Sequence, residues 1–329
     1  MSPQRWMPTP GPGRITLALL AVVPAVMAYP WRSPRDYWVL GIAVAAVIVL
    51  FGCWRGLYFT TLVRRRLAII GRGQSAAAEP DSATATTALL RVGAPGGDAD
   101  VLPLPLIARY LNRYGIRAHK IRITNRDNAS DPSRRETWIG LTISATENLA
   151  ALRARSPRIP LHETAQVAAR RLADHLRELG WDVTAVAPDD VPRLLTSNAR
   201  ESWSGVQRGA SDYLAAYQIP VDAGLAETLA AIREHPARET CTALEFAGDG
   251  THHTVAAACA FLTDTAPGRI DPPAGLIPQR GNHRPALQAL DLLSTRRLDG
   301  HAEVPTGLLA QLDWPTPVRQ AAAAEVART

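Results

Sequence analysis

Asp98 and Asp100 form an Asp-x-Asp pair, the arrangement in this chain that most directly suggests metal chemistry. In enzymes that transfer sugars from nucleotide donors, such a pair holds a divalent cation against the diphosphate, because hard cations prefer oxygen ligands. The pair lies in the glycine-rich segment 93–100, behind a short weak strand signal at Ala88–Val92. We therefore expect a solvated turn without a metal, and a cation-dependent transferase is the alternative.

Two further groups of polar residues have structural interpretations. Asp189 and Asp190 precede a predicted short helix, Val191–Ser197, where carboxylates meet the unpaired N–H groups of a helix start. His252 and His253 are adjacent on a predicted strand. Their side chains then point to opposite faces and cannot share one metal ion without distortion. Neither group predicts a catalytic or metal site.

The motifs that cradle phosphates, bind zinc or present an activated serine are missing from the sequence. It contains no GxxxxGK[ST], GxGxxG, HExxH or GxSxG pattern, and phosphate binding or metal ligation needs such spacings. Acids such as Glu201, Asp212 and Glu245 are scattered, and no spacing selects any of them. We expect no catalytic residue, no cofactor and no metal.

The cysteines give little support for a bridge or a zinc site. Cys53 falls in an apolar segment, whereas Cys241 and Cys259 fall in predicted strands. A disulfide between the last two across a hairpin is conceivable, but reduced thiols are expected in a cytoplasmic domain. No CxxC or CxxH spacing occurs, so a structural zinc site is not expected.

Two apolar segments near the start of the chain determine where the rest of it lies. Ile15–Tyr29 is uncharged and interrupted by Pro24, and Tyr37–Phe59 contains a single charge, Arg55. An apolar helix of about 20 residues crosses a ~30 Å hydrocarbon core. The short connection, residues 30–36, suits a tight hairpin. The pattern predicts two transmembrane helices, at about residues 15–31 and 37–59.

The charges beside these segments predict their orientation. Lysine and arginine are retained on the cytoplasmic side of a membrane, and an arginine cluster follows the second segment: Arg64, Arg65, Arg66 and Arg72. Aromatic residues that favour the headgroup level lie near the segment ends: Trp31, Trp38, Trp54 and Tyr58. We expect a multi-pass plasma-membrane protein with both termini in the cytoplasm. A signal peptide cleaved near Ala28 is the alternative, and it would place the large domain outside.

Small residues and positive charge indicate what these segments contact. Gly41 and Ala45 have the small-xxx-small spacing that lets transmembrane helices approach closely. The formal charge is +6, and much of the excess lies beside the membrane, where arginine attracts anionic lipid. Basic residues are not interleaved with aromatic residues, so we expect no nucleic acid partner. A small-molecule substrate is not expected either.

The rest of the chain predicts a tether and one large domain. Residues 1–14 form a short cytosolic N-terminus, 60–87 a basic juxtamembrane segment and flexible tether, and 321–329 a frayed C-terminus. Residues 88–320 predict a cytosolic α/β domain with a mixed sheet. The whole chain is 47% hydrophobic and 20% charged over 329 residues, enough to bury a core beyond the membrane part.

Strand and helix signals alternate through this domain. The predicted elements are a helix at 105–114, strands at 118–124 and 135–145, helices at 147–155 and 163–179, strands at 181–187 and 211–219, a helix at 222–235, a hairpin of strands at 240–247 and 251–263, and a helix at 284–297. Lys120 and Arg122 alternate with isoleucines, which predicts one wet face or an edge strand. Residues 125–133 predict a turn-rich loop. The strand–helix–strand order from Trp138 to Val186 favours a parallel pair joined by a right-handed crossover.

Three motifs occur in one order along the chain. Residues 134–142 read RRETWIGLT, and the helix from Glu163 ends in HLRELGW at Trp181. The third motif consists of TVAAACAF at 254–261 followed by GLIPQRGNHRPAL at 275–287. Together with the two-span hairpin, this order resembles the EccE component of the actinobacterial type VII (ESX) secretion machinery.

The resemblance implies a function and a fold. It implies a non-catalytic structural subunit of an inner-membrane secretion complex, with EccB, EccC and EccD as partners. The domain would have a degenerate glycosyltransferase-like fold that lacks the catalytic set. The family's β-rich stretch before Trp138 is cut down here, so contacts through that stretch are not carried over. The alternatives are a membrane-tethered glycosyltransferase-like enzyme using Asp98 and Asp100, and a regulatory module that binds a ligand in the α/β cleft.

Overall fold

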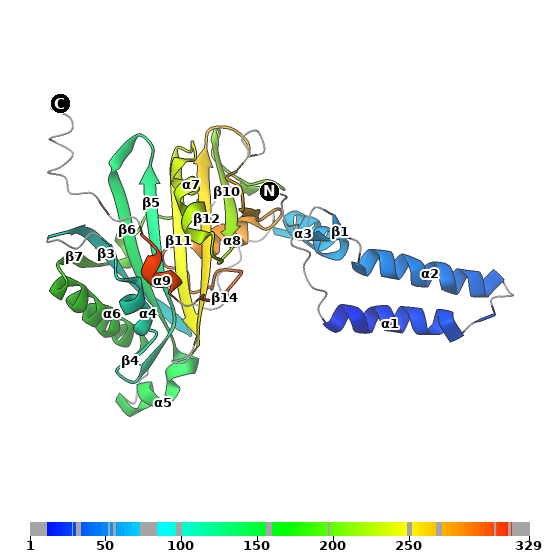
Figure 1. Cartoon of the computed structure of the whole chain (residues 1–329), viewed down its shortest axis with the longest axis horizontal. Helices are drawn as coiled ribbons and strands as arrows, with labels where there is room; N and C mark the ends of the chain where they lie inside the picture. Colours follow the sequence, from blue (N-terminus) through cyan, green and yellow to red (C-terminus); the bar gives the residue numbers. More distant parts are fainter. Residues whose placement is uncertain are drawn as a thin grey trace. The chain divides into compact units, whose positions relative to one another are not determined.

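A computed structural model shows two compact units, Met1–Ser75 and Ala76–Thr329 (Figure 1). It describes residues 12–27, 29–30, 34–51, 53–54, 57–72, 84–96, 101–155, 160–196, 198–248, 252–267, 272–305, 307–314 and 317. The Asp98–Asp100 pair, Trp31 and the predicted C-terminal segment 321–329 lie outside these ranges.

The described residues of the first unit form three helices and a short two-stranded ladder. Helices α1 (Pro12–Met27) and α2 (Pro34–Phe51) pack against each other. The buried residues of this pair are alanines, Ala18, Ala25 and Ala43, whose small side chains let two helix backbones approach closely. Most of the larger apolar side chains point outward; Leu20 is 73% exposed. By length and composition α2 is able to cross a membrane, whereas the apolar part of α1 is shorter.

The second predicted span is wrong at its C-terminal end. Helix α2 ends at Phe51, and strands β1 (Cys53–Trp54) and β2 (Leu57–Tyr58) form an antiparallel ladder before α3 (Phe59–Arg72) begins. Glycines at 52 and 56 in the sequence punctuate the apolar run, and glycine is a poor helix former because ordering its backbone costs more entropy. Hydrophobicity alone did not reveal this break.

The second unit is built on one large sheet. Its order is β7-β3-β6-β5-β11-β12-β10-β9-β8, and every strand pair among the described residues is antiparallel. The long strands are β3 (Ala85–Pro95), β5 (Ile116–Asn128), β6 (Asp131–Ser144), β7 (Trp181–Val186), β10 (Asp212–Ile219), β11 (Glu239–Gly248) and β12 (His253–Thr263). The short ones are β4 (Asn112–Arg113), β8 (Arg200–Glu201), β9 (Val206–Arg208), β13 (Ile277–Pro278) and β14 (Ala302–Glu303).

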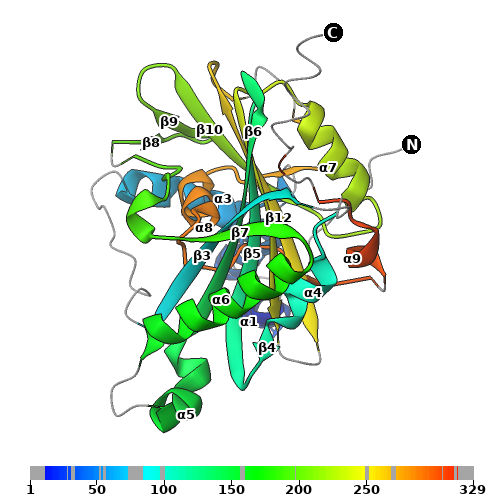
Figure 2. The same ribbon diagram turned by 90° about the vertical axis from the view of Figure 1, so that its left-hand side faces the viewer.

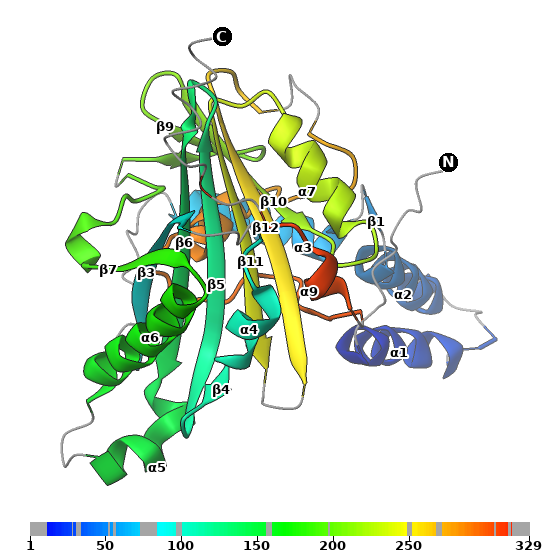
Figure 3. The ribbon, with the colours of Figure 1, turned by 60° about the vertical axis from the view of Figure 1, so that its left-hand side comes forward.

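Helices cover both faces of this sheet (Figures 2 and 3). Helices α4 (Leu104–Arg109), α6 (Leu161–Glu178), α7 (Leu225–Glu234) and α9 (Leu308–Gln311) pack on one face, and α8 (His283–Leu290) packs on the other. Helix α5 (Ala145–Arg155) follows β6 directly. The architecture is therefore a mixture of helices with an antiparallel sheet.

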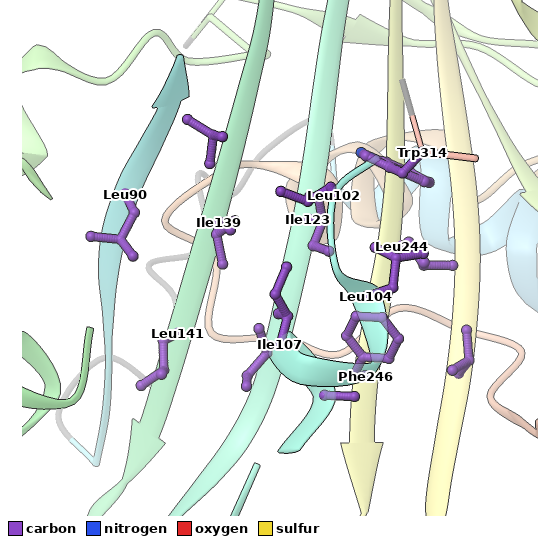
Figure 4. Close-up of a cluster of buried hydrophobic side chains, with 14 of the residues drawn as sticks. Leu90, Leu102, Leu104, Ile107, Ile123, Ile139, Leu141, Leu244, Phe246 and Trp314 are labelled. Carbon is purple, nitrogen blue, oxygen red and sulfur yellow. The ribbon is translucent and has the colours of Figure 1, made fainter. Parts of the chain in front are cut away.

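The larger core lies under α4, α6, α7 and α9. In Figure 4, Leu90, Ile139, Ile123 and Leu244 come from four neighbouring strands, and Leu104 of α4 belongs to the same buried cluster. Close to this cluster, Trp314 is fully buried, and its indole N–H donates to Oδ1 of Asn125 at 3.0 Å. The segment that follows α9 thus contributes a large side chain to the core.

The predicted parallel pair is wrong. Strand β3 lies between β6 and β7 and is antiparallel to both. Strands β6 and β7 consequently run in the same direction, as a strand–helix–strand crossover requires, but they are not neighbours. The pairing of β3, a strand that precedes both in the sequence, could not be read from the local pattern between Trp138 and Val186.

Several predicted boundaries also change. The helix predicted at 105–114 ends at Arg109, and Gly115, with φ of 70°, lies in the β4–β5 turn instead of capping a helix. The loop predicted at 125–133 is strand almost throughout, with a turn at Ala129–Ser130. A 3₁₀ turn at Pro188–Asp190 replaces the helix predicted at 191–197. The helices predicted at 147–155 and 163–179 and the hairpin β11–β12 are confirmed within one or two residues.

Candidate functional site: a buried ion cluster

Three charged side chains lie on the face of the sheet that carries α8. Lys120 and Arg122 come from β5, and Glu245 comes from β11 directly opposite Arg122. The prediction of a wet face is wrong here, because the exposed fractions of the three residues are 1%, 3% and 0%. β5 is a central strand, and the segment 291–301 contacts these residues on this face.

Glu245 accepts hydrogen bonds at both carboxylate oxygens. Arg122 contacts Oε2 with Nη2 at 2.7 Å and Nε at 2.8 Å, and Lys120 Nζ lies 3.4 Å from the same oxygen. The backbone N–H of Leu298 donates to Oε1 at 2.9 Å, and His301 Nε2 lies 3.1 Å from Oε1. A buried carboxylate is stable only with such partners, because taking an unpaired charge out of water is costly.

The same cations bind carbonyl groups of the segment 291–301. Arg122 donates to the carbonyl of Asp291 at 3.1 Å and to that of Arg296 at 2.8 Å, and Lys120 also donates to Arg296. Helix α8, predicted to continue to Arg297, ends at Leu290, just before this segment. The cluster satisfies backbone groups that a helix would otherwise have paired internally.

The electrostatics differ between the two ends of the cluster. Burial alone would raise the pKa of Glu245, but Arg122, the bond from His301 and Lys120 outweigh it and hold this pKa far below its usual range. Burial, helped by Arg122, lowers the pKa of Lys120 well below its usual value despite the nearby carboxylate. Arg122 is therefore the main partner of Glu245, and Lys120 is a surplus basic group.

This arrangement holds a loop rather than performing chemistry. Both oxygens of Glu245 are occupied by protein groups, and the cluster is closed to solvent except at His301. Within the ranges that the structure describes, no group of three or more His, Cys, Asp or Glu side chains is placed to hold a metal ion. The cluster fixes 291–301 against the sheet.

Cys241 and Cys259 are free and buried. Cys241 faces the α8 side of the sheet and Cys259 faces the larger core, so the conceivable disulfide is excluded by their opposite directions. Burial raises the pKa of Cys241 to about 12, which keeps it a thiol at neutral pH. The expectation of reduced core thiols is confirmed.

Comparison with known proteins gives the chain its family. The family model EccE, described as "Putative type VII ESX secretion system translocon", matches residues 131–219. Two strains of Mycobacterium tuberculosis have proteins named "ESX-3 secretion system protein EccE3" that are 60% identical over 311 residues, covering 94% of this chain and 93% of the relative. The chain belongs to the EccE family.

A further EccE relative comes from Mycolicibacterium smegmatis and carries the same printed name. It is 48% identical over 289 residues, covering 88% of this chain and 90% of the relative. As an EccE protein, the chain is a component of the type VII (ESX) secretion system, with other components of that system as partners. The matched family region runs from β6 to β10 and contains the first two of the three motifs; the third lies outside it.

The residues predicted to set the membrane orientation of this EccE chain share one helix. Arg64, Arg65 and Arg66 lie on α3, and Arg72 is its last residue. Of the predicted aromatic anchors, Trp38 is 74% exposed on α2, and Trp54 and Tyr58 belong to β1 and β2. Gly41 and Ala45 lie on the exposed surface of α2, away from the buried alanines that face α1.

The ion cluster was missed by reasoning from the sequence, although a signal was present. Lys120 and Arg122 interrupt a strand whose other face is isoleucine, and Glu245 stands alone in the apolar run of β11. One acid and two bases in the middle of apolar strands indicate a buried ion pair when both strands are central. The missing information was that β5 and β11 are neighbours.

Proposed function

We propose that this EccE protein is a non-catalytic structural subunit of an inner-membrane complex of the type VII secretion system, and that it supports protein export. The observation that carries the proposal is 60% identity over nearly the whole length with proteins named as ESX-3 secretion system proteins. We therefore also propose that it serves an ESX-3-type system. The buried cluster supports a structural role, because its charges hold a loop instead of facing an open cleft.

The membrane part of the proposal is a two-helix hairpin with both termini in the cytoplasm. Helix α2 has 18 residues and α1 has 16, which at 1.5 Å per residue give about 27 and 24 Å of helix, close to a ~30 Å hydrocarbon core. The arginines of α3 favour the cytoplasmic surface and its anionic lipid. Trp31, Trp38, Trp54 and Tyr58 would be the interface anchors.

The partners we propose are EccB, EccC and EccD. Gly41 and Ala45 offer a small-residue surface on α2 to a partner helix, because both are exposed and a Cβ at Gly41 would meet no atom within 4 Å. Close approach at such a surface is what helix association in lipid requires. Because β3 begins at Ala85, the predicted boundary after residue 87 moves, and we propose residues 60–84 as the juxtamembrane segment and tether and residues 85–320 as the cytosolic domain.

The fine classification of the domain is also a proposal. A sheet covered by helices on both faces is compatible with a degenerate glycosyltransferase-like fold without the catalytic set. This assignment, and the absence of enzymatic activity, rest on the family resemblance.

The test is complementation of a strain whose own copy has been deleted. The wild-type chain restores recovery of the membrane complex and export, and we expect the double variant Asp98→Asn, Asp100→Asn to restore both equally. A wild-type sample purified in parallel serves as the control for the expression level of the variant. If the double variant assembled the complex but did not restore export, while the wild type restored both, the result would favour the cation-dependent transferase and contradict the structural role.

A further inference from the structure

A cavity of about 250 Å³ lies between α8, strands β10 and β12, and the segment 296–299. Alanines line it on two sides: Ala216 and Ala258 come from the sheet, and Ala286 and Ala289 come from the helix that packs over it. Their methyl groups make part of the lining apolar. We refer to this cavity between the helix and the sheet as the slot.

Three carboxamide side chains line this slot: Gln218, Gln279 and Asn282. None of the three has a side-chain hydrogen bond to any part of the chain that the structure describes. Gln279 lines the cavity and is only 7% exposed. Buried polar groups are nearly always paired, and each carboxamide offers two N–H donors and one acceptor. The cavity therefore suits an occupant with complementary groups.

A heterocyclic base has the matching chemistry. Its two flat faces are apolar and fit between alanine walls, while its edge carries alternating donors and acceptors. Asn and Gln read the edge of adenine in this bidentate way. The cavity is smaller than the pockets of about 300–1,000 Å³ that hold drug-sized ligands, and so it suits a molecule of nucleoside size.

The rim of the slot is charged. Arg296, Arg297 and Asp299 are exposed there, which leaves one net positive charge. Arg297 donates to the carbonyl of His119 at 2.8 Å, whereas the guanidinium of Arg296 has no acidic partner among the described residues. A guanidinium is a strong binder of phosphate, and a single net charge suits a single phosphate.

We propose that this slot binds a purine mononucleotide, with the base between the alanine walls and the phosphate at Arg296. The site goes beyond the structural role proposed above, because it would make the domain responsive to a small molecule. The carbonyl of Arg296 is held by Lys120 and Arg122. Nucleotide binding would therefore stabilise the same segment that the ion cluster holds.

The test is calorimetric titration of the purified full chain in detergent with AMP, GMP and adenosine. We expect saturable binding of a purine monophosphate with a Kd below about 1 mM. Gln279→Leu should weaken it about tenfold, the loss expected when a buried hydrogen-bonding group is removed. Ala289→Phe should abolish it by filling the slot. Gln166→Leu, on the exposed surface of α6, is the matched control and should bind as the wild type does.

A surface variant keeps the test independent of folding. Arg296→Ala changes an exposed side chain, and it should reduce the affinity for AMP to that for adenosine while leaving thermal unfolding unchanged. No binding of any probe overturns the proposal, and so does binding that survives both Gln279→Leu and Ala289→Phe. The titration does not measure complex assembly. Its result therefore neither supports nor contradicts the structural role, which the complementation experiment tests.

Discussion

Glu245 joins residues that are far apart in the sequence. Its two oxygens connect β5, β11 and the backbone of Leu298 in one buried cluster. Of its two basic neighbours, Arg122 contacts Oε2 with two nitrogens, and Lys120 lies farther from the same oxygen. Removing one partner of a buried pair costs about 3–5 kcal/mol, because the other charge stays buried and unpaired. Substitutions at different members of the cluster should therefore lower the free energy of unfolding by very different amounts.

We expect Glu245→Gln to destabilise the protein by about 3–5 kcal/mol, which corresponds to a fall in Tm of about 10 °C for a domain of this size. Lys120→Met should change the stability by less than about 1.5 kcal/mol, since it removes a surplus buried cation. Thermal unfolding of the purified protein in detergent measures both. Equal effects of the two substitutions would contradict the assignment of Arg122 as the partner of Glu245.

The pH dependence follows from the same residues. The pKa of Glu245 is lower in the folded protein than in the unfolded chain, so the unfolded chain binds more protons as the pH falls below about 4.3. The contribution of Glu245 is complete above that pH and is lost toward lower pH. Stability of the wild type should fall more steeply between about pH 5 and 3 than that of Glu245→Gln. If the stabilities of the wild type and Glu245→Gln, measured as the pH is lowered, fell in parallel, the prediction would be contradicted.

At the scale of the element, α6 shows which part of an amphipathic pattern is buried. Leu172 and Leu176 are fully buried, whereas Val167 is 42% exposed and Leu179 is 44% exposed. All four belong to the apolar stripe that the sequence suggests. The other buried positions of the helix are filled by small residues: Thr164, Ala165, Ala169 and Ala173.

We expect Leu172→Ala to cost about 2–5 kcal/mol, because it leaves a cavity in the core. Val167→Ala on the same helix should cost less than about 0.5 kcal/mol, as exposed positions usually do. Chemical denaturation of the two variants beside the wild type measures the difference. Similar losses at both positions would mean that α6 buries a different face.

Helix α2 supports a prediction about partners. Gly41→Leu adds a side chain on a surface where nothing within 4 Å opposes it, so the chain itself should fold normally. If a partner helix lies close to that surface, recovery of EccB, EccC and EccD with the tagged chain should fall several-fold. Ile42→Leu, at an exposed neighbouring position, is the control. Unchanged recovery in Gly41→Leu would exclude a close helix contact there.

The sequence predicted elements whose pattern is local and missed those that depend on distant partners. Helix α6 was predicted because its apolar residues recur at helical spacing, and the β11–β12 hairpin was predicted from the turn signal between its strands. Residues 125–133 were predicted as a loop because they are polar. In the structure, Arg126 pairs with Glu239, and Arg135 binds Asp127 at 2.5 Å, so polar residues continue the strands. The partner Glu239 lies on another strand and could not be identified from the local sequence.

At the scale of the whole molecule, orientation in the membrane decides where the sheet domain functions. A reporter that is active only in the cytoplasm, fused at the C-terminus, should be active, and carbonate washing should leave the protein in the membrane pellet. The physical reason is the arginine-rich α3, since arginine is retained on the cytoplasmic side. Activity of an export-dependent reporter at the same position, or release by carbonate, would overturn the proposed topology.

The position of β3 has a mechanical consequence. Helix α3 ends at Arg72, and β3, which begins at Ala85, is the next strand among the described residues; it is an interior strand bonded on both sides. Ladder bonds in an antiparallel sheet are perpendicular to the strands. Traction along β3 therefore shears two ladders at once, whereas an edge strand would peel away one bond at a time. We therefore expect the sheet to resist mechanical separation when force is applied through the segment that precedes β3.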